Sequence, residues 1–349
     1  MPKAIPALVL TTLAGAQSLP SDAEIRKLLA HRIDVQKKSL AMVAGIVAPE
    51  GTRIVSYGGV DSDTVFEIGS LTKVFTALLL ADMAQRGELA LTDPVAKYLP
   101  PGTRMPKPKG RAIELLDLAT HTSGLPLWPP DFPTPLDFSA FSKYTEAQMY
   151  HFLATYELPR DTGSQWDYSN IGFALLGHAL TRRAGMDYES LVHSRICAPL
   201  KLESTSIDLT PPIKRRLAVG HDAELKPSPE WSMPPFAVGA GSLHSTANDL
   251  LKLLAAFMDV EKSPLGSSMA AMFDTRRPGP QGMQQALGWW VVPLPGGAPI
   301  ATHRGQSAGF FSNVAYDPAT RTGVVVLSNS AADDGGIAWH LLRPKFPVQ

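Results

Sequence analysis

Three short segments of the chain carry side chains that can act together in acyl transfer. They are Ser70-Leu71-Thr72-Lys73, Tyr168-Ser169-Asn170 and His303-Arg304-Gly305, in that order. A serine hydroxyl becomes an effective nucleophile only when a base takes its proton, and lysine, tyrosine and histidine can all serve. A Ser-x-x-Lys segment alone occurs readily by chance. The three segments in a fixed order indicate a serine acyl-transfer enzyme.

The first segment lies where turn residues give way to a strongly apolar stretch. Residues 74–84 are mostly apolar and Arg86-Gly87 follows them, which is typical of a buried helix with a C-terminal glycine. Lys73 is then one turn after Ser70 on the same face, so the amine can reach the hydroxyl. An amine in apolar surroundings at a helix N-terminus loses its proton more readily. The alternative is that Ser70 only caps the helix and Lys73 is solvated, but a lone Lys in an apolar helix favours the catalytic interpretation.

In the second segment, Tyr168 and Asn170 are two residues apart, so the phenol and the carboxamide can face one pocket. A tyrosinate is a good base, but at neutral pH it needs a nearby cation such as Lys73. The Asn170 amide can hold a substrate carbonyl and also Lys73. The alternative is that Asn170 caps the helix expected from Ile171 to Arg183 while Tyr168 merely packs.

The third segment has the pattern of a strand. A glycine on an inner strand, here Gly305, lets a substrate backbone approach closely. The backbone N–H groups of Ser70 and Gln306 can then serve as the two donors to a developing oxyanion. The alternative is that His303 and Arg304 are ordinary strand residues that face solvent.

Residues 305–309 also match Gly-x-Ser-x-Gly, with the serine at Ser307. The nucleophile elbow of α/β-hydrolases has this pattern and requires a strand before the serine and a helix after it. Here Phe310 to Tyr316 has the pattern of a strand, and no alternating strand–helix order is present. We therefore interpret the match as accidental.

The expected elements run from strands to a long helical part and back to strands. We predict an α/β (α+β) fold in which one antiparallel sheet from both chain ends is flanked by helices and carries a large inserted helical lobe. The sheet lobe is expected at about 21–62 and 285–349, and the helical lobe at about 70–280. Expected strands are 41–47, 53–57, 288–292, 310–316 and 323–327, and expected helices are 21–38, 94–98, 113–120, 145–154, 171–183, 188–196 and 337–342.

Composition excludes several classes of function. The chain has 349 residues, is 44% hydrophobic and 18% charged, and carries no net charge, so a nucleic-acid partner is not expected. The single cysteine, Cys197, is expected to be buried and inert. The nine histidines show no tight metal-ligand spacing, so neither a metal nor another cofactor is expected.

The N-terminus has the features of an export signal. Lys3 precedes an apolar run from Ala7 to Leu13, and Ala14-Gly15-Ala16 fits the small-x-small cleavage pattern. We predict a signal peptide at 1–16 and a mature hydrolase domain at 17–349 in the periplasm or outside the cell. The alternative is an ordinary disordered N-terminus. The apolar run is too short to cross a bilayer, and no other segment is expected to do so.

With these residues in hand, the chain resembles the penicillin-recognising serine hydrolases, especially the class C β-lactamase branch. That branch also holds low-molecular-weight penicillin-binding proteins, D-alanyl peptidases and related carboxylesterases. The resemblance implies a serine β-lactamase/DD-peptidase-like fold in which Ser70 is acylated, Lys73 and Tyr168 share the proton transfer, and Asn170 orients the substrate. It extends from about Ala41 to Asn329 and rests on the phrases 67–73, 118–126 and 166–170.

Two positions depart from this family pattern. Class C β-lactamases usually carry Lys-Thr-Gly where this chain has His303-Arg304-Gly305, and the Lys adds positive charge near the tyrosine and the substrate carboxylate. His303 is only partly charged at neutral pH, although Arg304 supplies charge if it turns inward. Trp128 lies in a loop where the family's lactamases tend to have a polar residue, so we include it among the expected substrate-binding residues.

The leading hypothesis is therefore an exported, monomeric serine hydrolase that forms an acyl-enzyme with β-lactams or D-alanyl cell-wall peptides. A second hypothesis is a carboxylesterase that uses the same Ser-Lys-Tyr residues on short acyl esters. The third, a binding module without activity, is disfavoured because Ser70, Lys73 and Tyr168 are all present.

Overall fold

The computed structural model describes residues 19–107, 110–133, 138–230, 232–294 and 297–349. The segment predicted as a signal peptide, 1–16, lies outside these residues. Among the residues described, no helix is long and apolar enough to cross a bilayer.

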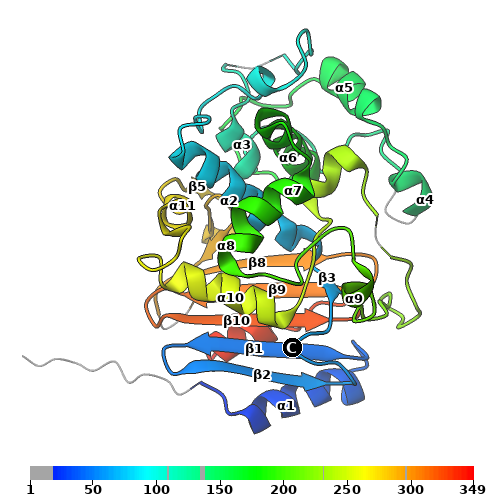
Figure 1. The fold of residues 1–349 in the computed structure, drawn as a ribbon, viewed down its shortest axis with the longest axis vertical. Helices are drawn as coiled ribbons and strands as arrows, with labels where there is room; N and C mark the ends of the chain where they lie inside the picture. The colour runs from blue at the N-terminus through cyan, green and yellow to red at the C-terminus, as the bar shows by residue number, and fades with distance from the viewer. Residues whose placement is uncertain (1–18, 108–109, 134–137, 231, 295–296) are drawn as a thin grey trace, which may run out of the picture.

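The centre of the fold is an eight-stranded antiparallel sheet in the order β2-β1-β10-β9-β8-β7-β6-β5 (Figure 1). It joins both chain ends, because β1 pairs with β10 so that Val43 lies opposite Leu327. The predicted sheet is thereby confirmed. The strands are β1 Met42–Ala48, β2 Gly51–Tyr57, β5 Arg277–Pro278, β6 Gln284–Gln285, β7 Trp290–Val292, β8 Ile300–Gln306, β9 Phe311–Asp317 and β10 Thr322–Ser328.

Both faces of the sheet are covered, and the side chains of the central strand β10 show why. Val324 and Val326 belong to one apolar core, and Val325 and Leu327 to the other, as expected for a strand whose successive side chains point to opposite faces. One face packs against α1 (Asp22–Ala30), the π-helical turn η1 (His31–Val35) and α12 (Ile337–Leu342). The other packs against α2 (Thr72–Gln85) and α10 (Ala247–Met258) (Figure 1).

Between β2 and β5 the chain builds the helical lobe, whose helices α5 and α6 lie above α2 in Figure 1. Here α5 is Glu146–Thr155 and α6 is Asn170–Ala184, and Gly185 ends α6 in the left-handed conformation. The remaining elements are β3 Phe66–Glu67, η2 Gly69–Leu71, η3 Val95–Tyr98, α3 Leu115–Ala119, α4 Phe138–Phe141, α7 Tyr188–Val192, η4 His193–Cys197, α8 Ala198–Leu200, α9 Pro211–Lys214, η5 Pro235–Ala240, β4 His244–Ser245, α11 Gly266–Ala271 and η6 Pro280–Gly282.

The cysteine of the helical lobe is buried, as expected. Cys197 lies at the end of η4 and its thiol donates to the carbonyl of Thr205 at 3.7 Å. Burial raises the pKa of the thiol to about 12, so the thiolate that would react is scarce at neutral pH.

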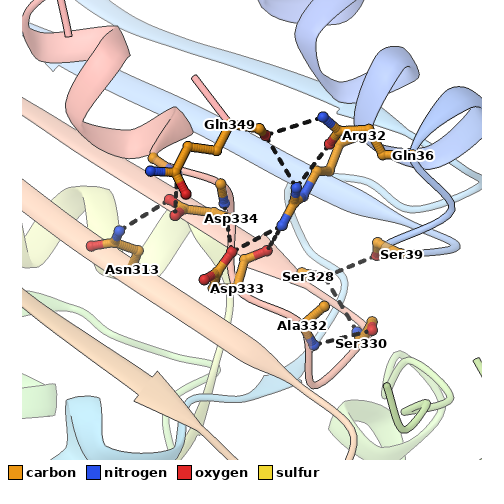
Figure 2. A network of polar contacts seen from close by, with 12 residues as sticks. Arg32, Gln36, Ser39, Asn313, Ser328, Ser330, Ala332, Asp333, Asp334 and Gln349 are labelled. Carbon is orange, nitrogen blue, oxygen red and sulfur yellow. Dashed lines mark hydrogen bonds and ion pairs between the residues drawn. The ribbon is translucent and has the colours of Figure 1, made fainter. Parts of the chain in front are cut away.

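A polar network fastens the C-terminal segment to the face of the sheet that α1 and α12 cover (Figure 2). The buried guanidinium of Arg32 donates to the carbonyl oxygen of Asp333 at 2.7 Å and to its carboxylate at 2.9 Å. Asp334 is buried and accepts from Asn313 Nδ2 at 3.0 Å and from the backbone N–H of Ala338 at 3.0 Å. This network contributes to stability on the face of the sheet away from α2.

Candidate active site

Ser70 and Lys73 lie at the start of α2, where the sequence predicted them. Ser70 is in the 3₁₀ turn η2 that precedes the helix, and Lys73 is the second residue of α2 and is fully buried. Lys73 Nζ is 2.9 Å from Ser70 Oγ and 2.6 Å from the carbonyl oxygen of Ala240. No side chain caps α2 at its N-cap residue, Leu71. The alternative of a capping serine beside a solvated lysine is therefore wrong.

Burial sets the protonation of Lys73. Desolvation lowers the pKa of its amine well below the usual value, because the charged form loses its hydration. The apolar surroundings include two rings, since Nζ lies 5.1 Å from the ring centroid of Tyr168 and 5.7 Å from that of Phe173. A neutral amine has a lone pair, so Lys73 can accept the proton of Ser70.

The carbonyl of Ala240 was not predicted, and the hydrogen bonds of α2 explain its position. Thr76 Oγ1 donates to the carbonyl of Gly239 at 2.6 Å, and Thr72 Oγ1 accepts from the N–H of Leu243 at 3.1 Å. These two bonds hold the end of η5 and the residues that follow it along α2, on either side of Lys73. The Ala240 carbonyl accepts from one Lys73 N–H and so orients the amine beside Ser70 Oγ.

Tyr168 lies just before the N-terminus of α6, with its ring beside Lys73, and Asn170 is the first residue of that helix. Burial raises the pKa of Tyr168 above its usual value, and a side-chain hydrogen bond with Ser70 acts in the opposite direction. Tyr168 is therefore a phenol at neutral pH. The cap of α6 is Ser169, whose Oγ accepts from the N–H of Gly172 at 2.9 Å, so the alternative of Asn170 as the cap is wrong. In the described structure the partners of Lys73 Nζ are Ser70 and Ala240, not the Asn170 amide.

His303 lies on β8 and is fully buried, so the alternative of a solvent-facing residue is wrong for it. Its ring stacks on Trp290 with the centroids 4.9 Å apart. Burial lowers the pKa of His303 to about 3, and the nearby Lys73 acts in the same direction. His303 is thus neutral where the family's lysine would be charged.

Arg304 does not supply the missing charge. It is exposed, and its guanidinium lies 5.6 Å from the ring centroid of Trp290 and 5.9 Å from that of Trp339 on α12. Neighbouring residues of a strand point to opposite faces, so with His303 turned toward the site, Arg304 points to the face that α12 covers.

Gly305 and Gly69 bring β8 into direct contact with the turn that carries Ser70, η2 and the residue Ile68 before it. A Cβ atom on Gly305 would lie 1.9 Å from the carbonyl oxygen of Ile68, and one on Gly69 would lie 2.6 Å from the carbonyl oxygen of Gln306. Gly69 also has a φ of +50°, which favours glycine. The sequence predicted close approach of a substrate at Gly305, and the structure adds an approach by the chain's own backbone. The Gln306 side chain donates to the carbonyl of Ala331 at 2.7 Å.

Ser307 is not a nucleophile elbow. It follows β8, its N–H donates to the carbonyl of Phe310 at 3.0 Å, and the chain continues as the strand β9. The helix that an elbow requires after the serine is replaced by this strand. The prediction that the match is accidental is confirmed.

Trp128 lies in the loop that contacts the start of α6. Its ring stacks on Phe132 with the centroids 4.4 Å apart and meets Phe141 edge-on at 5.5 Å. The preceding carbonyl, that of Leu127, accepts from the N–H of Asn170 at 2.9 Å. The loop is therefore attached to the segment that carries Tyr168 and Asn170. The Trp128 ring itself packs in an aromatic cluster with Phe132 and Phe141.

One side chain at the site was not predicted, although it lies in the phrase 118–126 that carries the family resemblance. His121 is buried and its ring centroid lies 4.4 Å from that of Tyr168. Local sequence reasoning gave it no role because it lies about fifty residues before Tyr168 and belongs to no pattern of its own.

The sheet covered by helices on both faces, with the half-buried Ser70 beside the buried Lys73 and with a tyrosine and a neutral histidine near them, defines a serine hydrolase. The family model described as Beta-lactamase matches residues 22–344, and the chain belongs to that family. The expected family is thereby confirmed.

Relatives with described functions cover most of the chain. It is 32% identical over 279 residues to the D-alanyl-D-alanine-carboxypeptidase/endopeptidase AmpH of Escherichia coli K12. The aligned region covers 76% of this chain and 71% of AmpH. It is 28% identical to a beta-lactamase of Pseudomonas fluorescens, with 88% and 94% covered. It is 27% identical to penicillin-binding protein 4 of Amycolatopsis lactamdurans, with 82% and 76% covered.

Proposed function

We propose that this serine hydrolase forms an acyl-enzyme on Ser70 with D-alanyl peptides or β-lactams and releases the acid by hydrolysis. The observation that carries the proposal is the 2.9 Å approach of a fully buried Lys73 amine to Ser70 Oγ. A lysine whose pKa is lowered by burial can take the serine proton without help from another base.

In the first step, Ser70 Oγ attacks the carbonyl carbon of the substrate and its proton passes to Lys73 Nζ. The oxyanion that forms accepts from the backbone N–H groups of Ser70 and Gln306, which belong to segments in van der Waals contact through Gly69. Tyr168 passes a proton to the leaving nitrogen or oxygen and recovers one from Lys73. The carbonyl then re-forms as the bond to the leaving group breaks.

In the second step, a water attacks the acyl-enzyme and transfers its proton to the Tyr168–Lys73 pair. The bond to Ser70 Oγ breaks, and the serine oxygen takes a proton back from Lys73. Asn170, Trp128, Gly305 and His303 are the proposed substrate contacts around this centre. Since every charge that forms is neutralised within the same cycle, the resting site returns to neutral Lys73 and a protonated Tyr168.

Support for the substrate class comes from the relatives, of which one is described as a D-alanyl-D-alanine carboxypeptidase/endopeptidase and others as beta-lactamases. A specific observation favours the second candidate, a carboxylesterase. The neutral His303 and the outward Arg304 offer no fixed cation to a substrate carboxylate, and simple esters have none. Export remains part of the proposal and rests on the N-terminal signal pattern in the sequence.

The test is the intact mass of the protein after incubation with a penicillin, with Ser70→Ala as the control. We expect a penicilloyl adduct, or hydrolysed penicillin in solution, that is absent with the Ser70→Ala variant. Parallel assays with a D-alanyl-D-alanine peptide and with p-nitrophenyl butyrate assign the substrate class. Turnover of the ester alone would select the carboxylesterase, and equal activity in Ser70→Ala would overturn the acyl-enzyme on Ser70.

A further inference from the structure

The backbone of His121 is held in a conformation that a histidine rarely adopts. His121 has a φ of +57° and is 1% exposed, so it is buried in the left-handed region that favours glycine. Such strain persists only where the surrounding structure fixes it, and it is concentrated at functional sites. The contacts of His121 show which part of the site this conformation serves.

Three contacts connect His121 to the segment that carries Tyr168. Its carbonyl oxygen accepts from the N–H of Asp167 at 2.8 Å, and its ring Nδ1 accepts from the N–H of Ser169 at 3.1 Å. Its ring lies against the phenol ring, with centroids 4.4 Å apart and planes inclined by 33°. One residue thus binds the backbone on both sides of Tyr168 and packs on its side chain.

The charge state of His121 suits this arrangement. Because Nδ1 accepts a hydrogen bond, the neutral ring carries its proton on Nε2. Burial lowers the pKa of His121 well below the usual value, and Lys73 and His303 act in the same direction. Protonation of Nδ1, which would break the bond to Ser169, is thereby prevented at neutral pH.

We propose that His121 is a positioning residue that fixes the phenol of Tyr168 in reach of Ser70. The inference rests on the proposed role of Tyr168 in proton transfer and adds the group that makes this role possible. Three contacts of His121 fall on residues 167–169, and its ring also lies against Phe173 with the centroids 4.9 Å apart. Removal of the ring therefore frees the tyrosine to move while Ser70 and Lys73 keep their own bond. A displacement of about 1 Å at a reacting group costs roughly 10²-fold in rate.

The variants follow from the backbone conformation. His121→Gly accepts the positive φ and deletes the ring, and His121→Asn also tolerates that φ and keeps an acceptor oxygen near the place of Nδ1. The control is His178→Asn, a buried histidine of α6 whose Nε2 contacts Tyr150 Oη at 2.7 Å. Each variant is compared by kcat and KM on the substrate that the wild-type turns over fastest, alone and combined with Tyr168→Phe.

If His121 acts through Tyr168, His121→Gly lowers kcat about 10²-fold with little change in KM, and added imidazole restores part of the loss. His121→Asn loses less than His121→Gly, and His178→Asn stays within about twofold of the wild-type. In the Tyr168→Phe background, His121→Gly causes no further loss, and imidazole restores nothing.

Two results would overturn the inference. One is that His121→Gly and His121→Asn have the kcat of the wild-type. The other is that His121→Gly loses the same factor in kcat with and without the Tyr168 hydroxyl, which would mark a structural role only. A fully active Tyr168→Phe contradicts the proposed mechanism itself, so the two failures are distinguishable. Should His121→Gly fail to fold, the same comparison is made with His121→Asn.

Discussion

The close contact between β8 and the turn that carries Ser70 predicts how far a side chain at position 305 would push the two apart. Gly305 faces the carbonyl of Ile68, two residues before Ser70. A Cβ added by Gly305→Ala would lie 1.9 Å from that oxygen and 2.6 Å from Ser312 Oγ, whereas real Cβ atoms keep at least about 3.0 Å. Because the nearest atom belongs to the backbone, it cannot turn aside, and β8 must move away from the turn by about 1.1 Å.

This separation should lower the activity strongly without unfolding the protein. The two proposed oxyanion donors, Ser70 N–H and Gln306 N–H, lie on opposite sides of the contact, so a shift of this size separates them and costs about 10²-fold in kcat/KM. Overpacking of this kind lowers the free energy of unfolding by about 1–3 kcal/mol. We expect the acylation rate to fall by about 10²-fold while the protein remains folded at 25 °C.

The assay measures acylation by stopped flow and the free energy of unfolding by urea titration. The matched control is Gly323→Ala on β10, where the new Cβ meets side-chain atoms, Leu254 Cβ at 3.0 Å and Val47 Cγ1 at 3.1 Å. At these distances the neighbours need to give by only a few tenths of an ångström, and none of them belongs to the turn that carries Ser70, so the control should keep kcat/KM within about twofold. If Gly305→Ala acylates as fast as the control, the contact does not set the geometry of the oxyanion hole and the reasoning is refuted.

Three further perturbations test other parts of the molecule. Lys73 acts only when deprotonated, and burial lowers its pKa, so kcat/KM should rise as the pH rises through that lowered pKa and then stay level. Lys73→Arg keeps its proton, so this variant should lose both the pH profile and the activity. His303 has a pKa of about 3 and stays neutral from pH 5 to 8, so His303→Lys should raise kcat/KM for a penicillin relative to an uncharged ester by about tenfold, and an unchanged ratio contradicts the charge argument. Arg32→Met removes the guanidinium of the network behind the sheet and should lower the free energy of unfolding by about 1–3 kcal/mol in urea titration at unchanged kcat/KM.

The sheet and the order of lobes were predictable because strands and helices here obey their local patterns. The runs 41–47 and 323–327 are β-branched and apolar and became the paired strands β1 and β10. The helix expected from residue 21 begins at the capping box of Ser21 and Glu24, which starts α1. The approach of Lys73 to Ser70 follows from helix geometry alone, since residues three apart share a face.

Other features of the site depend on contacts that no local pattern encodes. The carbonyl of Ala240 comes to Lys73 from 167 residues away. Because it is a backbone group, the residue type at position 240 does not indicate this role. His121 and Tyr168 meet only through the fold. The directions of His303 and Arg304 were left open, because alternation along a strand shows that they differ but not which one faces the site.

The electrostatics of the site follow from burial more than from any ion pair. Lys73, His121 and His303 all lie in surroundings that favour their neutral forms, and each would lower the proton affinity of the others if charged. Keeping both imidazoles neutral therefore preserves Lys73 as the group that accepts the serine proton. Acylation then creates one ammonium and one oxyanion at short range in a site of low dielectric, where their attraction is strongest. A charged lysine at position 303 would bind a substrate carboxylate but would also weaken the base, so the neutral histidine favours proton transfer over recognition of charge.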